Sequence, residues 1–169
     1  EAIVDKGIPV LATSSTCTFT LRDEYPHLLE VDNTGLREHI ELATRFLWRK
    51  LDSGQTLPLG KLPLKVVYHT PCHMEKMGWS IYTLELLRLI PGLELTVLDS
   101  RCCGIAGTYG FKRENYPTSQ AIGAPLFRQI EESGADIVVT DCETCKWQIE
   151  MSTSKRCEHP ITLLAKALA

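Results

Sequence analysis

The second half of the sequence alternates three times between a short apolar segment and a segment with helical periodicity. The apolar segments, which are typical of buried β-strands, are residues 64–69, 93–98 and 136–140. Helical spacing of apolar residues follows over residues 80–90 and 116–133, from about residue 143, and near residues 161–168. Strands that alternate with helices favour a parallel sheet covered on both faces. The order therefore predicts an α/β fold with a Rossmann-like parallel sheet flanked by helices.

The first third of the sequence has a different pattern. Residues 7–13 form an apolar run typical of a strand, and residues 36–51 carry apolar side chains at helical steps. Residues 53–63 are rich in glycine and proline and predict a linker. A lone strand cannot bury itself, so we expect residues 1 to about 30 to complete a domain whose front lies outside this chain.

Cysteines follow all three strands predicted in the second half. Cys72 comes after the first strand, Cys102 and Cys103 after the second, and Cys142 and Cys145 after the third. The carboxyl ends of parallel strands lie along one edge of a sheet, where such folds bind their ligands. We therefore expect these five thiols to converge on one site at that edge.

The composition limits what these thiols can be for. The chain has 169 residues, 44% hydrophobic and 23% charged, and its net charge is 18 − 21 = −3, as in an ordinary globular protein without a general nucleic-acid footprint. Seven cysteines cannot all pair, and a chain of this length does not need a disulfide framework. No run approaches the roughly 18 apolar residues that span a bilayer. Metal ligation, thiol chemistry and buried structural cysteine remain as alternatives.

The spacing around the cysteines favours a bound centre. Cys142 and Cys145 lie one helical turn apart at the start of a predicted helix, where the positive helix end favours thiolates and a negatively charged cluster. Five thiols are one more than a tetrahedral zinc site or a cubane cluster needs. Gly104, Gly107 and Gly110 predict a loop wrapped round a cofactor, with a flexible surface loop as the alternative.

Several neighbouring residues have other interpretations. His73 follows Cys72 and is a weak metal-ligand candidate, with support of the loop and a plain surface position as alternatives. His69 ends a strand, so we expect it to be packed. Cys157 follows none of the predicted strands, and we expect a half-buried thiol outside the site. A thioredoxin-like dithiol is less favoured, because that motif usually stands without three further cysteines.

The cysteine spacing resembles that of a known family. The order is Cys72, 29 residues, Cys-Cys-Gly at 102–104, 37 residues and then Cys142-x-x-Cys145. This order is similar to that in the cysteine-rich CCG domain of heterodisulfide reductases, glycolate oxidase iron–sulphur subunits and lactate-utilisation proteins. The sequence of residues 68–78, 102–111 and 141–149 resembles most the iron–sulphur subunits of anaerobic glycerol-3-phosphate dehydrogenases. The likeness covers essentially the whole chain.

The resemblance implies a division of the chain. Such proteins carry two CCG domains after a ferredoxin-like section, so residues 1–30 resemble the tail of a truncated first CCG domain. Residues 31–63 then form a helix and linker, and residues 64–169 a complete second CCG domain. In the first domain, Ser14 stands where a closing Cys-x-x-Cys would begin, which leaves Cys17 as a weak candidate ligand.

The resemblance also implies a function, that of a non-catalytic electron-transfer subunit of an oxidoreductase. Its electrons would come from flavin-bearing catalytic subunits and pass to the menaquinone pool, at the cytoplasmic face of the inner membrane, where the subunit would be peripheral. The implied cofactor is a [4Fe-4S] cluster, cubane or non-cubane, and the implied ligands are Cys72, Cys102, Cys103, Cys142 and Cys145.

Two alternatives to this function stay open. Some CCG domains hold zinc, so a structural zinc module that docks other subunits is one of them. A heterodisulfide-type thiol redox domain is the other. We also expect exposure to air to remove an iron–sulphur cluster and to oxidise pairs such as Cys142 and Cys145.

Overall fold

The computed structural model describes residues 4–99 and 101–168 and contains two parallel sheets. The larger sheet has the strand order β4-β3-β5-β6. Its strands are β3 (Lys65–Tyr68), β4 (Glu94–Val97), β5 (Ile137–Val139) and β6 (Arg156–Glu158). The chain leaves β3 to one side for β4 and then crosses to the other side for β5, so the connections diverge at β3, where such sheets form a ligand crevice. The predicted α/β fold is confirmed.

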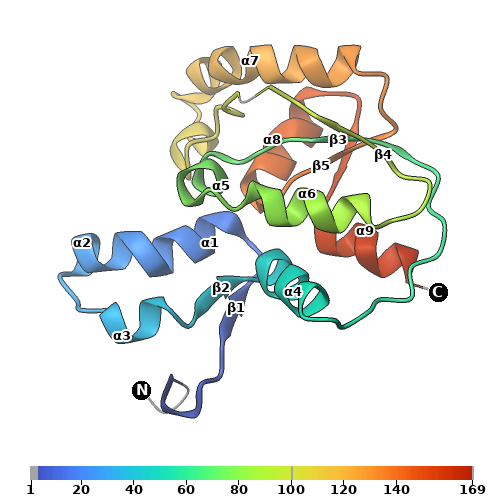
Figure 1. Cartoon of the computed structure of the whole chain (residues 1–169). Coiled ribbons are helices and arrows are strands. Elements are labelled where there is room, and N and C mark those ends of the chain that lie inside the picture. Colours follow the sequence, from blue (N-terminus) through green and yellow to red (C-terminus); the bar gives the residue numbers. More distant parts are fainter. Residues whose placement is uncertain (1–3, 100, 169) are drawn as a thin grey trace.

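Helices cover both faces of this sheet (Figure 1). One face packs against α7 (Tyr116–Glu132) and α8 (Glu143–Ser152), and the other against α6 (Ser80–Arg88) and α9 (Pro160–Ala167). Strand side chains alternate between the two cores, with Val67 and Val138 facing α7 and α8. Within the described part of the chain, no helix combines the length and apolar character needed to cross a membrane.

The smaller sheet pairs β1 (Val10–Ala12) with β2 (Ile40–Leu42), and it joins residues on both sides of the boundary predicted near residue 30. A continuous helix over residues 36–51 is therefore wrong, because α4 begins only at Ala43 and ends at Asp52. Residues 40–42 are buried and meet the backbone hydrogen-bonding groups of β1. Pairing with a strand thirty positions away overrides the local helical spacing.

Short helical segments complete the described part of the chain. Before β2 lie η1 (Val4–Lys6), α1 (Ser15–Phe19), η2 (Thr20–Glu24), α2 (Tyr25–Leu29) and α3 (Thr34–Arg37). After β3 comes α5 (Cys72–Met77), and after β4 comes η3 (Tyr109–Phe111). Helix α4 packs against α6, where Leu47 and Trp48 join the core beneath the larger sheet. The N-terminal part is thereby fixed to the second half of the chain.

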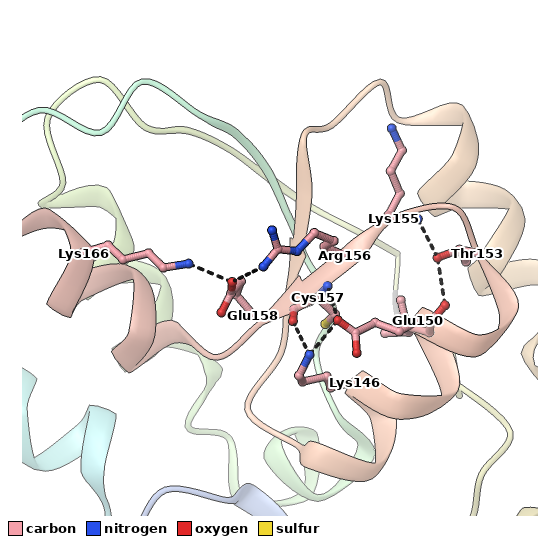
Figure 2. Close-up of polar contacts among 9 residues, drawn as sticks. Lys146, Glu150, Thr153, Lys155, Arg156, Cys157, Glu158 and Lys166 are labelled. Atoms are coloured by element: carbon pink, nitrogen blue, oxygen red, sulfur yellow. Dashed lines mark hydrogen bonds and ion pairs between the residues drawn. The ribbon is translucent and has the colours of Figure 1, made fainter.

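Strand β6 is an edge strand whose outer side is protected by α8 (Figure 2). The amide of Cys157 donates to Oε1 of Glu150 over 3.0 Å, and its carbonyl accepts from Nζ of Lys146 over 2.7 Å. These two α8 side chains also form an ion pair of 2.6 Å. They occupy backbone groups that β5 does not use, which blocks pairing with another chain. Cys157 is thus a fully buried strand residue and not the half-buried thiol expected.

Helix α7 touches the Cys-Cys-Gly loop backbone to backbone. A Cβ added to Gly123, in the middle of α7, would lie 2.5 Å from the carbonyl oxygen of Cys103 and would also clash with the ring of Phe127. Gly104 has φ +86°, and a Cβ there would clash with the carbonyl oxygen of Ser119 on α7. Two glycines therefore set how closely the loop that carries Cys103 lies on the helix.

We predict that Gly123→Ala destabilises the protein by about 1–3 kcal/mol, although glycine to alanine inside a helix usually stabilises by about 1 kcal/mol. The reason is that the carbonyl of Cys103 cannot give way without moving its loop. Urea unfolding of the metal-free protein measures the change. The control is Gly35→Ala in α3, where a Cβ meets nothing within 4 Å. If Gly123→Ala and Gly35→Ala have equal free energies of unfolding, the contact between α7 and the carbonyl of Cys103 has room for a Cβ and the prediction is wrong.

Candidate cysteine-rich metal centre

The five predicted cysteines lie together at the edge formed by the carboxyl ends of β3, β4 and β5. Cys72 is the first residue of α5, and Cys102 and Cys103 lie in the loop after β4. Cys142 immediately precedes α8, and Cys145 lies in the first turn of that helix. Cys103, Cys142 and Cys145 are buried, whereas Cys72 and Cys102 are exposed. The site therefore has an interior of three thiols and a mouth of two.

The thiols are close enough to perturb one another. Sγ of Cys103 lies 3.2 Å from Sγ of Cys145. A hydrogen bond with Cys145 lowers the pKa of Cys142 to about 5, and one with Cys102 lowers the pKa of Cys103. Desolvation raises the pKa of Cys72, and the charges of neighbouring thiolates add to that rise. Five thiolates cannot share this space without a positive charge among them, and a metal centre supplies one.

Polar groups of the protein also contact the sulphurs. The amide of Gly104 donates to Sγ of Cys102 over 3.3 Å. The hydroxyl of Thr144 lies 3.3 Å from Sγ of Cys142, and the hydroxyl of Thr16 lies 3.5 Å from the same sulphur. Hydrogen-bonding groups around ligating sulphurs are typical of metal centres whose reduction potential the protein adjusts.

His69 holds two of the strand-end loops and offers no free nitrogen to a metal. Its Nε2–H donates to the carbonyl of Arg101 over 3.2 Å, since a carbonyl can only accept. Its Nδ1 therefore accepts from the hydroxyl of Thr140, 3.1 Å away. The ring is 2% exposed, and burial lowers its pKa, which keeps it neutral. His69 is a packed residue, as the sequence predicts.

His73 contacts the N-terminal part of the chain instead of a sulphur. Its Nδ1 lies 3.0 Å from the hydroxyl of Thr16, and its ring stacks on Phe19 with centroids 4.9 Å apart. The roles considered for His73 were metal ligand, support of the loop and a plain surface position, and these contacts favour a supporting role. Cys17 is exposed on α1, and the residue before it, Thr16, is the one that reaches Cys142.

Thr16 is a residue of this site that the sequence did not reveal. Its hydroxyl and Sγ of Cys142 meet across 126 positions of the chain, so no local motif contains both. The nearest indication in the sequence was the position of residues 14–17 after a predicted strand. That position predicted a ligand for a different site, in the upstream CCG domain. The contact arises from the way α1 packs on α5.

Asp141 fixes the loop that carries Cys142. Its carboxylate accepts hydrogen bonds from the hydroxyl of Tyr68 over 2.6 Å and from that of Thr83 over 3.1 Å. Its backbone carbonyl accepts from the amide and the hydroxyl of Ser15, over 2.9 Å and 3.1 Å. Complete burial raises the pKa of Asp141 to about 6. Groups from β3, α6 and α1 thus meet at the residue before the ligand candidate.

The donor set fits an iron–sulphur centre or zinc by type, since both take cysteine thiolates. Among the described residues, however, no three side chains of His, Cys, Asp or Glu are placed to share a single metal ion. The sulphurs approach in pairs, as in the 3.2 Å contact of Cys103 with Cys145. The thiols thus fit both kinds of centre by type, and metal analysis decides between them.

Comparison with known proteins agrees with the site. Residues 66–150 match the model of the CCG cysteine-rich domain. The chain belongs to the CCG family. This CCG chain is 86% identical over all its 169 residues to a subunit of the anaerobic glycerol-3-phosphate dehydrogenase of Escherichia coli K12, and it spans 43% of that protein.

More distant relatives share part of the CCG chain. Identity is 34% over 146 residues with lactate utilization protein A of Geobacillus thermodenitrificans, covering 79% of this chain and 58% of that protein. It is 33% over 96 residues with an uncharacterized iron-sulfur protein of Methanocaldococcus jannaschii, covering 56% of this chain and 19% of that protein. The predicted family resemblance is confirmed.

We predict that mild oxidation of the metal-free protein joins Cys103 to Cys145, whose sulphurs lie 3.2 Å apart, in place of the pair Cys142 and Cys145 expected from their spacing. Oxidised glutathione supplies the oxidant, and mass spectrometry of proteolytic peptides identifies the bond. Cys103→Ser abolishes it, while Cys157→Ser, at a buried cysteine in β6, leaves it intact. Recovery of a bond between Cys142 and Cys145 as the main product contradicts the prediction.

Proposed function

We propose that this CCG domain holds an iron–sulphur centre and serves in electron transfer. The observation that carries the proposal is the convergence of five thiols from three strand ends on one partly buried site. The proposed ligands are Cys72, Cys102, Cys103, Cys142 and Cys145, and the proposed centre is a [4Fe-4S] cluster of cubane or five-thiol, non-cubane form. Such a centre, once bound, takes up and releases single electrons.

The chain's own residues suit that task. Cys103, Cys142 and Cys145 are at most 5% exposed and exclude water from the inner side of the site. Cys72 and Cys102 lie at the surface, so the distance from the site to a partner on that side is short. The amide of Gly104 donates to sulphur, and the nearby hydroxyls donate to sulphur when it is a metal-bound thiolate, so both disperse negative charge. The described site requires no group that handles substrate.

We further propose that the chain works within an anaerobic glycerol-3-phosphate dehydrogenase. The support is the 86% identity over its whole length to a subunit of the E. coli enzyme. In that role it receives electrons from the flavin-bearing catalytic subunits and passes them toward menaquinone. Its proposed location is peripheral, at the cytoplasmic face of the inner membrane.

Thiol redox chemistry is the second candidate function. The contact of 3.2 Å between Cys103 and Cys145 favours it, because a disulfide forms between sulphurs that can meet. A structural zinc module is the third candidate, since cysteine thiolates are also zinc ligands. All three candidates draw on the same set of cysteines, so metal content and redox response distinguish them.

The test is anaerobic reconstitution of the protein with iron and sulphide. We expect about equal amounts of bound iron and acid-labile sulphide, and a signal in electron paramagnetic resonance that changes on reduction. Cys103→Ser is expected to bind iron at least about tenfold more weakly, because a ligand is lost. Its matched control is Cys157→Ser, also buried but outside the site, which should bind iron as the unmodified chain does.

Other results separate the alternatives. About one zinc per chain without a redox response would identify the zinc module. A folded protein that binds no metal but cycles between dithiol and disulfide would identify thiol redox chemistry. Either result would overturn the electron-transfer proposal.

A further inference from the structure

The N-terminal part of the chain reaches the sulphur of Cys142 through one hydroxyl group. Oγ1 of Thr16, on α1, lies 3.5 Å from Sγ of Cys142 and 3.0 Å from Nδ1 of His73. Three residues that lie far apart in the sequence thus form a continuous chain of polar contacts that ends on a proposed ligand. Thr16 lies outside the span that matches the CCG family model.

Packing on both sides holds Thr16 in this position. The preceding residue, Ser15, is fully buried and bonds twice to the backbone carbonyl of Asp141. One turn later, Phe19 stacks on the ring of His73 with an angle of 11° between the planes. The hydroxyl of Thr16 therefore sits between two fixed contacts, and its distance to Cys142 is set by the fold.

The chemistry of a ligating sulphur gives these contacts a direction. A cysteine bound to metal is a thiolate and can only accept a hydrogen bond. The hydroxyl of Thr16 must then donate to Sγ of Cys142, and its oxygen is free to accept from His73. That acceptance requires a proton on Nδ1 of His73, the tautomer that this contact selects.

We propose that Thr16 and His73 are positioning residues for the metal centre, forming a directed chain from His73 through Thr16 to Cys142. This inference rests on the proposed function, because it takes Cys142 to be a metal ligand. A hydrogen bond to a ligating sulphur stabilises the reduced, more negative state of the centre. The N-terminal part of the chain thereby raises the reduction potential of a centre whose ligands lie elsewhere.

The first test compares reduction potentials of the reconstituted protein. In Thr16→Val, the ratio of reduced to oxidised centre at a fixed applied potential is expected to fall about fivefold, the effect of one hydrogen bond. Thr16→Ser, which keeps the hydroxyl, restores the ratio. The matched control is Thr18→Val on the same helix, where the lost bond of 2.9 Å runs to the carbonyl of Ser14. Equal ratios in Thr16→Val and the unmodified protein would overturn the proposal.

A second variant tests whether the two residues act as one chain. His73→Phe keeps an aromatic ring for the stack on Phe19 but removes the donor to Thr16. We expect it to shift the ratio in the same direction as Thr16→Val. The double variant is expected to shift it no further than Thr16→Val alone, because the chain is already broken. Additive shifts would show independent effects and contradict the proposal.

A measurement that does not need the iron–sulphur centre separates this proposal from the proposed function. In protein loaded with Zn²⁺, which is diamagnetic, long-range ¹H–¹⁵N NMR spectra report which ring nitrogen of His73 carries the proton. We expect the Nδ1–H tautomer in the unmodified protein and in Thr18→Val, and its loss in Thr16→Val. If no iron–sulphur centre assembles, the proposed function is wrong, but the NMR measurement still shows whether the hydrogen bond from His73 to Thr16 exists. An Nε2–H tautomer of His73 in the unmodified protein would overturn the proposed role of Thr16 and His73.

Discussion

A buried carboxylate holds together the elements on which the cysteine site depends. Asp141 follows β5 and precedes Cys142. Its carboxylate accepts from Tyr68 on β3 and Thr83 on α6, and its backbone carbonyl accepts from Ser15 on α1. An ionised group in the interior is costly unless it is fully hydrogen-bonded, and burial accordingly raises the pKa of this carboxyl to about 6. The bonds that offset this cost also fix the loop from which Cys142 reaches into the site. The placement of one ligand candidate is therefore coupled to three separate elements.

The loop after β4, which carries Cys102 and Cys103, is fixed by neutral hydrogen bonds and by close contact with α7. His69, at the end of β3, uses both ring nitrogens to bind the carbonyl of Arg101 and the hydroxyl of Thr140. Gly104 and Gly123 let the same loop lie directly on α7. Neutral hydrogen bonds and close backbone contact thus surround the thiols on the protein side. All five sulphurs can be thiolates together only when positive charge lies among them, and a metal centre would supply that charge.

The sequence predicts those features that depend on local pattern and on the topology of parallel sheets. The apolar runs that became β3, β4 and β5 are continuous, so the meeting of their cysteines follows from the direction of the strands. Strand β6 has three residues, two of them charged, and owes its place to Lys146 and Glu150 on α8. Strand β2 carries helical spacing but pairs with β1. Contacts with other elements decided both, and neither set of contacts follows from a strand or helix period in the sequence.

The physical unit of the site is larger than the span of the family match. Residues 66–150 carry all five cysteines, yet the hydroxyl that contacts Cys142 and the backbone bonds to Asp141 come from Thr16 and Ser15. A segment that packs on the mouth of a ligand set can alter hydrogen bonding to its sulphurs without changing any ligand. In this molecule the packing of α1 on α5 places such a segment there. Under the proposed function, the five cysteines determine what kind of centre can bind, whereas Thr16 and Ser15, outside the family match, adjust the sulphur environment on which its potential depends.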